Sequence, residues 1–279
     1  MTKAWLNGTI LASAQAALPA TDHGVLLGDG LFETFLVRNG GVRDLNLHLE
    51  RLRTSCERMG IALPDDDPAL AGAVRELVAE LAIADARVRI TVTSGDGPAG
   101  LRRGDGPATV LITAAPAHTG GRPLSAVTLP WRRNENSPIS GMKTLSMTEN
   151  VLAARSIDPA DEGIWLNTRG EVCEGNTTNV FFDLGKGLVT PPLSSGCLPG
   201  VARAGVLARA VHWGIPVGEY ALGGDILDDV RAGLVGMFLT SAVRGVAAVA
   251  TLDGHEVHRG RLTSRVEELV AGDDGLERL

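Results

Sequence analysis

The sequence predicts a protein of two mixed α/β lobes, and three observations support this fold class. Segments with strand and helix periodicity are interspersed along the whole chain, as in α/β and α+β proteins. A stretch of Pro, Gly and small polar residues, Ala115–Pro123, interrupts them and has the composition of a linker. The 279 residues are enough for two domains with cores of their own. We therefore expect a small N-terminal domain over residues 1–118, an interdomain linker over 119–125 and a larger C-terminal domain over 126–279.

Two β-hairpins are expected at the start of the N-terminal lobe. Asn7-Gly8 separates two short apolar runs, and this dipeptide is the strongest short signal for a tight hairpin turn. A second hairpin is expected from strand Leu31–Arg38, through the turn Asn39-Gly40-Gly41, to a return strand over Val42–Asp44.

Helices and further strands complete this lobe. Apolar side chains recur at spacings of four and three residues, which predicts an amphipathic helix that Gly60 ends. These side chains are Leu45, Leu49, Leu52, Cys56 and Met59. Asp67-Pro68 gives a cap and first-turn signal for a second helix that runs to about Ala84. Arg87–Thr93 alternates like a half-buried strand, and Ala108–Ala115 is a further strand.

Beyond the linker, apolar runs and turn signals alternate again. The turn Asn167-Thr-Arg-Gly170 separates two strands, Leu198-Pro-Gly200 precedes a helix, and a polar helix ends the chain. The expected strands are Ala126–Pro130, Ile164–Asn167, Asn179–Asp183 and Met237–Thr240, and the expected helices include Val151–Arg155 and Val201–Trp213.

The composition excludes several classes of protein. Hydrophobic residues make up 44% of the chain and charged residues 21%, which is typical of a soluble globular protein. No apolar run reaches the roughly 18–20 residues of a membrane helix, and the N-terminus has no signal-peptide core, so a cytoplasmic location is expected. The net charge of −7 without a basic tract disfavours nucleic acid and anionic membranes as partners. Three widely spaced cysteines argue against a disulfide framework or a cysteine-type zinc site.

One glycine-rich motif suggests a dinucleotide site but lacks the required context. Gly95-Asp-Gly97-Pro-Ala-Gly100 matches G-x-G-x-x-G directly after a strand. However, Pro98 and the residues after Gly100 do not open a helix, and no acidic residue follows about 20 residues later. A flexible loop between two strands is the preferred interpretation.

Lysine is rare in this chain, with three lysines against 23 arginines. Unlike arginine, lysine can lose its proton and act as a nucleophile or Schiff-base amine. Lys143 lies in an apolar segment preceded by Gly141, whereas Lys3 is close to the terminus and Lys186 is in a Gly-Lys-Gly turn. Base composition explains much of this scarcity, so the count alone does not assign a role to Lys143.

Two further charged residues have both a plain and a functional interpretation. Arg51 lies one helical turn after His48, beside the apolar stripe of its helix; it is either a solvated charge or a two-donor phosphate ligand. Glu174 lies in a polar turn that leads into an apolar strand; it is either a loop carboxylate or an acid that keeps a heteroaromatic nitrogen protonated.

A helix start and a pair of hydroxyls are candidates for binding an anion. Val201 and Ala202 open a helix after Leu198-Pro-Gly200, so their N–H groups point outward at the positive end of the helix dipole. Every helix has such an end, so this signal is weak alone. Thr240 and Ser241 end an apolar strand and either contribute hydroxyls to the same anion or only cap the strand.

In chain order these candidates are the groups that hold pyridoxal 5′-phosphate: a phosphate donor, an amine, a ring-nitrogen acid, a helix start and two hydroxyls. The chain resembles the fold-type IV (class IV) pyridoxal-phosphate enzymes along nearly its whole length. The motifs that carry the resemblance are Asp22-His-Gly, Gly28-Asp-Gly-Leu-Phe-Glu-Thr34, His48-Leu-Glu-Arg51-Leu, Lys143-Thr, Glu174-Gly-x-x-x-Asn179, Pro191-Pro192 and Leu198-Pro-Gly-Val. This family contains branched-chain aminotransferases, D-amino-acid aminotransferases, R-selective amine transaminases and 4-amino-4-deoxychorismate lyases.

The resemblance implies a fold and a role for each candidate. The fold is a two-domain fold-type IV enzyme of the α+β or α/β class, with the cofactor between a small and a large domain, in a homodimer. Lys143 matches the lysine that forms the Schiff base, Glu174 the acid at the ring nitrogen, and Arg51 the phosphate-binding arginine. Val201 and Ala202 match the phosphate-binding helix start, where many relatives have Ile-Thr, so Ala202 can offer only its N–H. Thr240 and Ser241 match the region of the other phosphate hydroxyls.

The residues expected to contact the substrate depart from the family in part. Relatives often have a tyrosine four or five residues after the lysine, or in the Gly-Asp-Gly motif, where this chain has Met147, Thr148 and Phe32. Phe32 and Arg89 are assigned to the substrate, Arg89 as a clamp for the α-carboxylate, with a structural salt bridge as an equal alternative. The Arg-x-His clamp of D-amino-acid enzymes is absent after Gly95.

The resemblance therefore predicts an aminotransferase that moves an amino group between an amino acid and a 2-oxo acid. A D-amino acid or an R-amine is the expected donor. The first alternative is a 4-amino-4-deoxychorismate lyase, which releases pyruvate and 4-aminobenzoate, and the second is a branched-chain L-amino-acid aminotransferase. A hypothesis of a different class is a non-catalytic or NAD-binding protein, which would show no reducible link between a cofactor and Lys143.

Overall fold

The computed structural model describes residues 2–117, 122–272 and 276–279, and these fall into two compact units. Unit 1 contains residues 2–117, 142–147 and 276–279, and unit 2 contains residues 122–141 and 148–272. The segment around Lys143 and the C-terminal residues therefore group with the N-terminal part of the chain. The expected division into consecutive domains assigns both of them to the C-terminal domain instead. Residues 119–121 of the expected linker lie outside the described residues.

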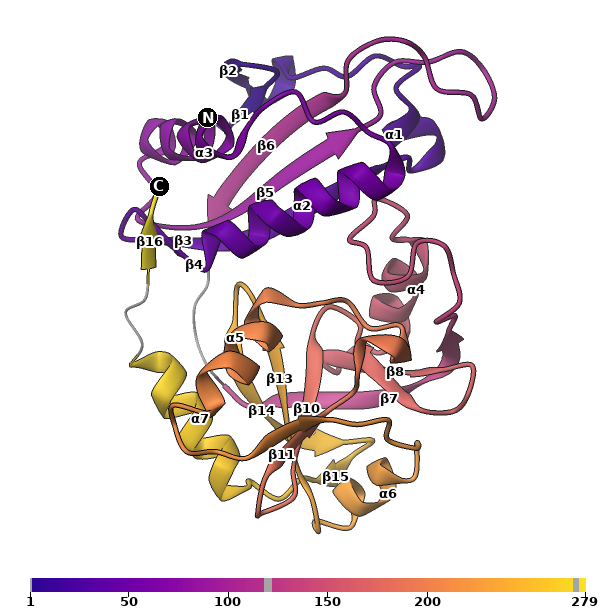
Figure 1. Cartoon of the computed structure of the whole chain (residues 1–279), viewed down its shortest axis with the longest axis vertical. Helices are drawn as coiled ribbons and strands as arrows, with labels where there is room; N and C mark the ends of the chain where they lie inside the picture. The colour runs from indigo at the N-terminus through magenta and orange to yellow at the C-terminus, as the bar shows by residue number, and fades with distance from the viewer. Residues whose placement is uncertain (1, 118–121, 273–275) are drawn as a thin grey trace. The chain divides into compact units, whose positions relative to one another are not determined.

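In its described residues, unit 1 contains a seven-stranded sheet (Figure 1). The strand order is β16 (Leu276–Arg278), β4 (Gly41–Arg43), β3 (Gly30–Arg38), β5 (Asp85–Thr93), β6 (Thr109–Pro116), β1 (Lys3–Leu6) and β2 (Thr9–Ala12). Its helices are η1 (Ser13–Gln15), α1 (His23–Leu27), α2 (Leu45–Met59) and α3 (Asp67–Leu81). The apolar stripes of α2 and α3 pack with the strand side chains of one sheet face into a single core, because both helices are amphipathic.

Unit 2 contains a nine-stranded sheet in the part that the structure describes. The main path is β12 (Val217–Glu219), β11 (Leu188–Thr190), β10 (Asn179–Asp183), β13 (Gly236–Ser241), β14 (Gly245–Leu252), β7 (Leu124–Arg133), β8 (Glu162–Asn167) and β9 (Val172–Gly175), and β15 (His255–Glu256) pairs with β14. Its helices are α4 (Thr148–Ser156), η2 (Leu193–Ser195), α5 (Val201–Ala210), α6 (Ile226–Arg231) and α7 (Arg261–Ala271).

The central strand β10 of unit 2 is buried on both faces. Phe181 packs with side chains of α5 and α7, whereas the next residue, Phe182, packs on the opposite face with side chains of α6. Successive side chains of a strand point to opposite faces, so a strand covered on both sides is apolar throughout rather than alternating. No helix in the described part of the chain is long and apolar enough to cross a membrane.

Most predicted elements of the sequence analysis are confirmed, with changed ends. The helix expected over Leu45–Met59 has these bounds, and Gly60 caps it. The helix after Asp67 ends at Leu81, and α5 ends at Ala210 rather than at Trp213. The strand expected over Ala126–Pro130 runs from Leu124 to Arg133, so it also carries the basic side chains of Arg132 and Arg133. The short elements α1, β9, β11, β12 and α6 were not predicted, because pattern recognition needs longer segments.

Candidate active site

Lys143 lies on an extended segment that pairs with the first residues of β3. The Phe32 N–H donates to the Lys143 carbonyl at 2.9 Å, and the Leu145 N–H donates to the Gly30 carbonyl at 2.9 Å. A Cβ at Gly30 would lie 2.7 Å from Leu145 Cδ1 and 2.4 Å from the carbonyl oxygen of Val92. The glycine therefore allows this segment to approach β3, and backbone hydrogen bonds fix the position of the lysine.

Phe32 lies close to two cationic side chains of unit 1. Lys143 Nζ is 4.4 Å from the centroid of the Phe32 ring, and the Arg89 guanidinium carbon is 3.6 Å from it. Arg89 also donates from Nε to Thr91 Oγ1 at 3.1 Å. Burial, and then the charge of Arg87, lower the pKa of Arg89. The structure thus brings the predicted substrate residues Phe32 and Arg89 together with Lys143.

Arg89 has no carboxylate partner in the part of the chain that the structure describes. A guanidinium stays protonated in proteins, and a partly buried charge is costly unless an opposite charge or hydrogen bonds compensate it. The salt bridge considered as an alternative for Arg89 is therefore not formed among the described residues. The arrangement can accept an anion such as a substrate carboxylate.

Arg51 is fixed on α2 by a buried carboxylate. Its Nε and Nη2 donate to the two oxygens of Glu33 at 2.7 and 2.8 Å, and His48 Nδ1 lies 2.8 Å from Glu33 Oε2. The Glu33 side chain is only 1% exposed and that of Arg51 11%, so Arg51 is not a solvated helix charge. Burial would raise the pKa of Glu33, but the charge of Arg51 and the hydrogen bonds from His48 and Arg51 outweigh it and lower the pKa to about 2.

In unit 2, Glu174 is attached to the segment that enters α5. The Leu198 N–H donates to Glu174 Oε2 at 2.8 Å, and Asn179 Nδ2 donates to the Leu198 carbonyl at 2.9 Å. Gly200 precedes α5, and a Cβ there would lie 1.9 Å from Asn179 Oδ1. The short loop that contains Leu198 is therefore bonded both to Glu174 on β9 and to Asn179, and the same loop leads into α5.

The start of α5 and the end of β13 fit a phosphate group. Val201 and Ala202 are the first residues of α5, whose N-cap Gly200 has no side chain to bond their N–H groups. Thr240 pairs with Asn179 in the sheet, and its side-chain oxygen is buried without a hydrogen-bond partner among the described residues. Ser241 Oγ accepts the Arg244 N–H at 3.1 Å, so this hydroxyl caps the turn after β13 while its proton is still available to donate.

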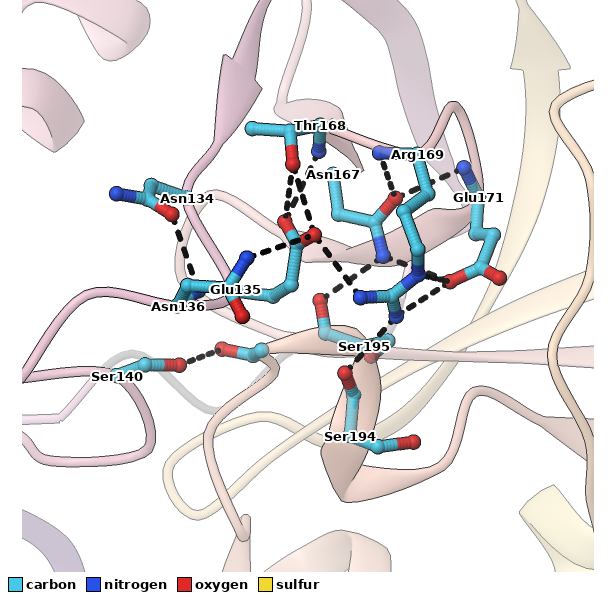
Figure 2. A network of polar contacts seen from close by, with 11 residues as sticks. Asn134, Glu135, Asn136, Ser140, Asn167, Thr168, Arg169, Glu171, Ser194 and Ser195 are labelled. Atoms are coloured by element: carbon cyan, nitrogen blue, oxygen red, sulfur yellow. Dashed lines mark hydrogen bonds and ion pairs between the residues drawn. The ribbon is translucent and has the colours of Figure 1, made fainter.

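A polar network fixes the start of the segment that leads to Lys143 (Figure 2). The Glu135 carboxylate accepts hydrogen bonds from the Thr168 backbone N–H at 3.0 Å and from the Thr168 hydroxyl at 2.7 Å, and it pairs with Arg169 Nη1 at 2.9 Å. Arg169 in turn donates to Glu171 at 2.7 Å and to the Ser194 carbonyl at 3.0 Å. The loop after β7 is thereby attached to the turn between β8 and β9 and to η2.

The nine predicted site residues belong to two separately described units. Lys143, Arg51, Phe32 and Arg89 are in unit 1, and Glu174, Val201, Ala202, Thr240 and Ser241 are in unit 2. Three residues that contact these side chains or the loop before α5 were not among the predicted site residues: Glu33, His48 and Asn179. A signal for the first two exists, because Glu33 is a charge inside an apolar strand and His48 lies one turn before Arg51.

Comparisons with known proteins agree with the resemblance seen in the sequence. The family model "Amino-transferase class IV" matches residues 30–252. A putative branched-chain-amino-acid aminotransferase of Methanocaldococcus jannaschii is 30% identical, over 95% of this chain and 94% of that protein. An aminodeoxychorismate lyase of Bacillus subtilis is 32% identical over 78% of both chains. A bifunctional aminodeoxychorismate lyase and D-amino acid transaminase of Mycobacterium tuberculosis is 31% identical, over 95% of this chain and 96% of that protein.

The fold is also that of solved structures. The branched-chain aminotransferase of Thermoproteus uzoniensis, solved with norvaline, superimposes with a TM-score of 0.88 at 26% identity, covering 97% of this chain and 93% of that one. The fold-type IV architecture, with two units of mixed α/β structure that each contain one sheet, is thus confirmed. The family match covers well over half of the chain. The chain therefore belongs to the class IV aminotransferase family and is a pyridoxal 5′-phosphate-dependent enzyme.

Proposed function

We propose that this enzyme transfers an amino group between an L-amino acid with a branched apolar side chain and a 2-oxo acid. The observation that carries the proposal is Arg89, a half-buried guanidinium without a carboxylate partner in the described residues, which lies over the same Phe32 ring as the Lys143 amine. An α-amino acid offers the carboxylate and the amino group that these two side chains require. The M. jannaschii relative and the T. uzoniensis structure support the branched-chain class.

Lys143 and Glu174 have distinct tasks in the proposed reaction. When bound, the cofactor supplies an aldehyde that captures amines and a ring that accepts the electrons left at the substrate carbon. Lys143 would hold the cofactor covalently, and its free amine would serve as the base that takes the proton from the substrate Cα. Glu174 would accept a hydrogen bond from the ring nitrogen and so favour its protonated form.

Each unit contains groups that could bind the cofactor phosphate. The N–H groups of Val201 and Ala202 and the hydroxyl groups of Thr240 and Ser241 donate to it in unit 2. Arg51 supplies the positive charge, and Glu33 keeps the Arg51 side chain in a fixed orientation.

A D-amino acid or an R-amine as the donor has less support than the branched-chain alternative. Arg103, an arginine in the loop after Gly95, donates to both carboxylate oxygens of Asp29 at 2.7 Å and to the Gly60 carbonyl at 3.1 Å. Its side chain is therefore engaged within unit 1 and is not a substitute for the missing Arg-x-His clamp.

The lyase reaction is the second candidate function. The B. subtilis lyase is 32% identical, and the substrate aminodeoxychorismate carries an amine and carboxylates that Lys143 and Arg89 are also suited to bind. In this case the same residues would release pyruvate and 4-aminobenzoate instead of passing the amino group to a second oxo acid.

Three parallel assays distinguish these activities in the purified holoenzyme. L-leucine with 2-oxoglutarate is expected to give glutamate, whereas D-alanine with the same acceptor and aminodeoxychorismate alone are expected to react at least about tenfold more slowly, a difference of about 1.4 kcal/mol in barrier. If the release of pyruvate from aminodeoxychorismate is the fastest of the three reactions, the enzyme is a lyase and the proposed aminotransferase activity is wrong.

Variants of two arginines on β5 test the carboxylate clamp. Arg89→Gln is expected to raise the KM for L-leucine by about tenfold or more, because one charge-assisted contact is lost. Arg87→Gln, a loss of the same charge two residues away at an exposed position, is the control and should change KM less than about twofold. Equal effects on KM in both variants would show that Arg89 does not bind the substrate carboxylate.

We also propose a homodimer, as the family resemblance implies. Apolar side chains are exposed on α1 at Val25, Leu26 and Leu27, and on α4 at Val151 and Leu152. Such surface side chains are typical of contacts between subunits. Sedimentation equilibrium should give twice the chain mass of 29.1 kDa, and a single-chain mass at micromolar concentration would refute the proposal.

A further inference from the structure

Arg133, the last residue of β7, lies beside the predicted ring-nitrogen acid in unit 2. Its guanidinium carbon is 4.4 Å from the ring centroid of Trp165, and its Nε is 3.6 Å from Glu174 Oε1. Strand pairing brings these residues together, since β7 pairs with β8 at Arg133 and Asn167, and Trp165 of β8 pairs with Glu174 of β9. The backbone positions of all three side chains are therefore set by one continuous part of the sheet.

The contact between Arg133 and Glu174 is electrostatic and not a hydrogen bond. A separation of 3.6 Å is too long for an N–H···O bond, and Arg133 Nε is buried without a hydrogen-bond partner among the described residues. The other carboxylate oxygen, Oε2, accepts the Leu198 N–H at 2.8 Å. Glu174 thus has a backbone donor on one oxygen and a positive charge close to the other.

A surface salt bridge alone does not account for the position of Arg133. Its Nη1 is 3.2 Å from Glu149, but the side chain of that glutamate is 70% exposed, and such pairs contribute little. The Arg133 side chain is only 18% exposed and its guanidinium lies over an indole ring, which costs desolvation. The interaction that compensates a buried cation here is the one with Glu174.

We propose that Arg133 is a positioning residue for Glu174, an inference that rests on the proposed role of Glu174 at the ring nitrogen. The Arg133 charge favours the ionised carboxylate, so the proton shared between Glu174 and the cofactor stays on the nitrogen. The Trp165 ring holds the planar guanidinium in place, which a lysine ammonium would reproduce only in charge. In this role Arg133 acts through Glu174.

The test uses the holoenzyme reconstituted with pyridoxal 5′-phosphate labelled with ¹⁵N in the ring. The ¹⁵N chemical shift reports whether the ring nitrogen carries a proton. Arg133→Gln is expected to move the signal toward that of the unprotonated nitrogen, to lower kcat/KM by about tenfold and to move the midpoint of its pH profile upward by about one pH unit. The midpoint rises because the Glu174 carboxylate, without the positive charge beside it, holds a proton more tightly and competes with the ring nitrogen for it.

Matched variants separate this role from a merely structural one. Arg132→Gln, the same change one residue earlier at an exposed position, should leave the ¹⁵N signal and the pH profile unchanged. Arg133→Lys keeps the charge and should restore most of the ¹⁵N signal even if it binds the cofactor less tightly. If Arg133→Gln is too unstable to purify, Arg133→Met, which keeps an apolar side chain on Trp165, replaces it.

The outcomes distinguish the inference from the proposed function. An unchanged ¹⁵N signal in Glu174→Gln would mean that the assignment of Glu174 is wrong. A changed signal in Glu174→Gln, together with an unchanged signal and pH profile in Arg133→Gln, would overturn the role of Arg133 alone. Loss of thermal stability in Arg133→Gln without a change in either readout would also overturn it, because Arg133 would then be only structural.

Discussion

At the scale of single residues, the protonation state of a buried acid such as Glu33 depends on the side chains around it. Glu33 is buried in β3 and would be costly there without the bidentate contact from Arg51 and the hydrogen bond with His48. Removing one of these three side chains leaves a buried charge uncompensated. This lowers the stability of the fold more than replacing all three by apolar side chains would. The candidate phosphate ligand Arg51 therefore depends on a residue that does not contact the phosphate.

The acid stability of the fold should depend on Glu33. Its pKa falls from 4.5 to about 2 in the folded protein, so its contribution is fully present above pH 4.5 and is lost as the pH falls toward about 2. The difference of about 2.5 pH units at 1.36 kcal/mol each amounts to roughly 3 kcal/mol. Urea unfolding of the wild type at pH 7 and at pH 3 should show most of this loss.

Glu33→Gln should remove this pH dependence and destabilise the enzyme at pH 7 by about 3–5 kcal/mol, the usual cost of breaking a buried ion pair. Glu50→Gln, on the exposed side of α2, is the control and should change the free energy of unfolding by less than about 0.5 kcal/mol. Equal acid sensitivity in the Glu33 variant and the wild type would contradict the lowered pKa.

At the scale of elements, the short loop between η2 and α5 links the two ends of the proposed cofactor in unit 2. Leu198 receives the Asn179 amide on its carbonyl and gives its N–H to Glu174, and two residues later Gly200 opens α5. Glu174 and the start of α5, the proposed ring-nitrogen acid and the proposed phosphate-binding helix start, are thus connected through one backbone segment. A displacement at Gly200 should affect both.

Gly200→Ala should weaken cofactor binding. The new Cβ would meet Asn179 Oδ1 at 1.9 Å, and Asn179 is only 5% exposed and cannot move away freely. We expect a loss of about 1–3 kcal/mol in stability, as for other overpacked sites, and a pyridoxal 5′-phosphate Kd raised by about tenfold or more, measured by titration of the apoenzyme. Gly72→Ala is the control, since its Cβ would have only an ordinary contact at 3.6 Å within α3 and should stabilise the helix slightly.

At the scale of the whole molecule, each unit has its own sheet and core, and each core contains cysteine. Cys56 lies in the core of unit 1, and Cys173 and Cys197 lie together in a cluster of unit 2. All three side chains are buried free thiols. Burial, followed by nearby acidic residues, raises the pKa of Cys56 and of Cys197 to about 11, and burial likewise raises the pKa of Cys173.

The native enzyme should therefore react very slowly with a thiol reagent. Both low exposure and the small thiolate fraction suppress the reaction at pH 8, so labelling should require unfolding of the unit that contains the cysteine. Pulse labelling at increasing urea, with mass spectrometry of the peptides, then reports unit 1 through Cys56 and unit 2 through the other two. Rapid modification of any of the three in the native enzyme, at the rate of the urea-unfolded chain, would contradict this burial.

The family and the main secondary structure could be predicted from the sequence alone, and so could a set of candidate groups for the site. The spacing from Leu45 to Met59 defined α2, Asn7-Gly8 defined a hairpin, and the order of Arg51, Lys143 and Glu174 indicated the cofactor, because local propensity and motif order are properties of the chain alone. Only the tertiary structure shows which side chains contact Arg51 and Glu174. Glu33 reaches Arg51 across 18 residues, and Arg133 reaches Glu174 across β8, through strand pairing and helix packing that no local pattern encodes. The state of a buried charge depends on such distant neighbours, so it could be assigned only after the fold was known.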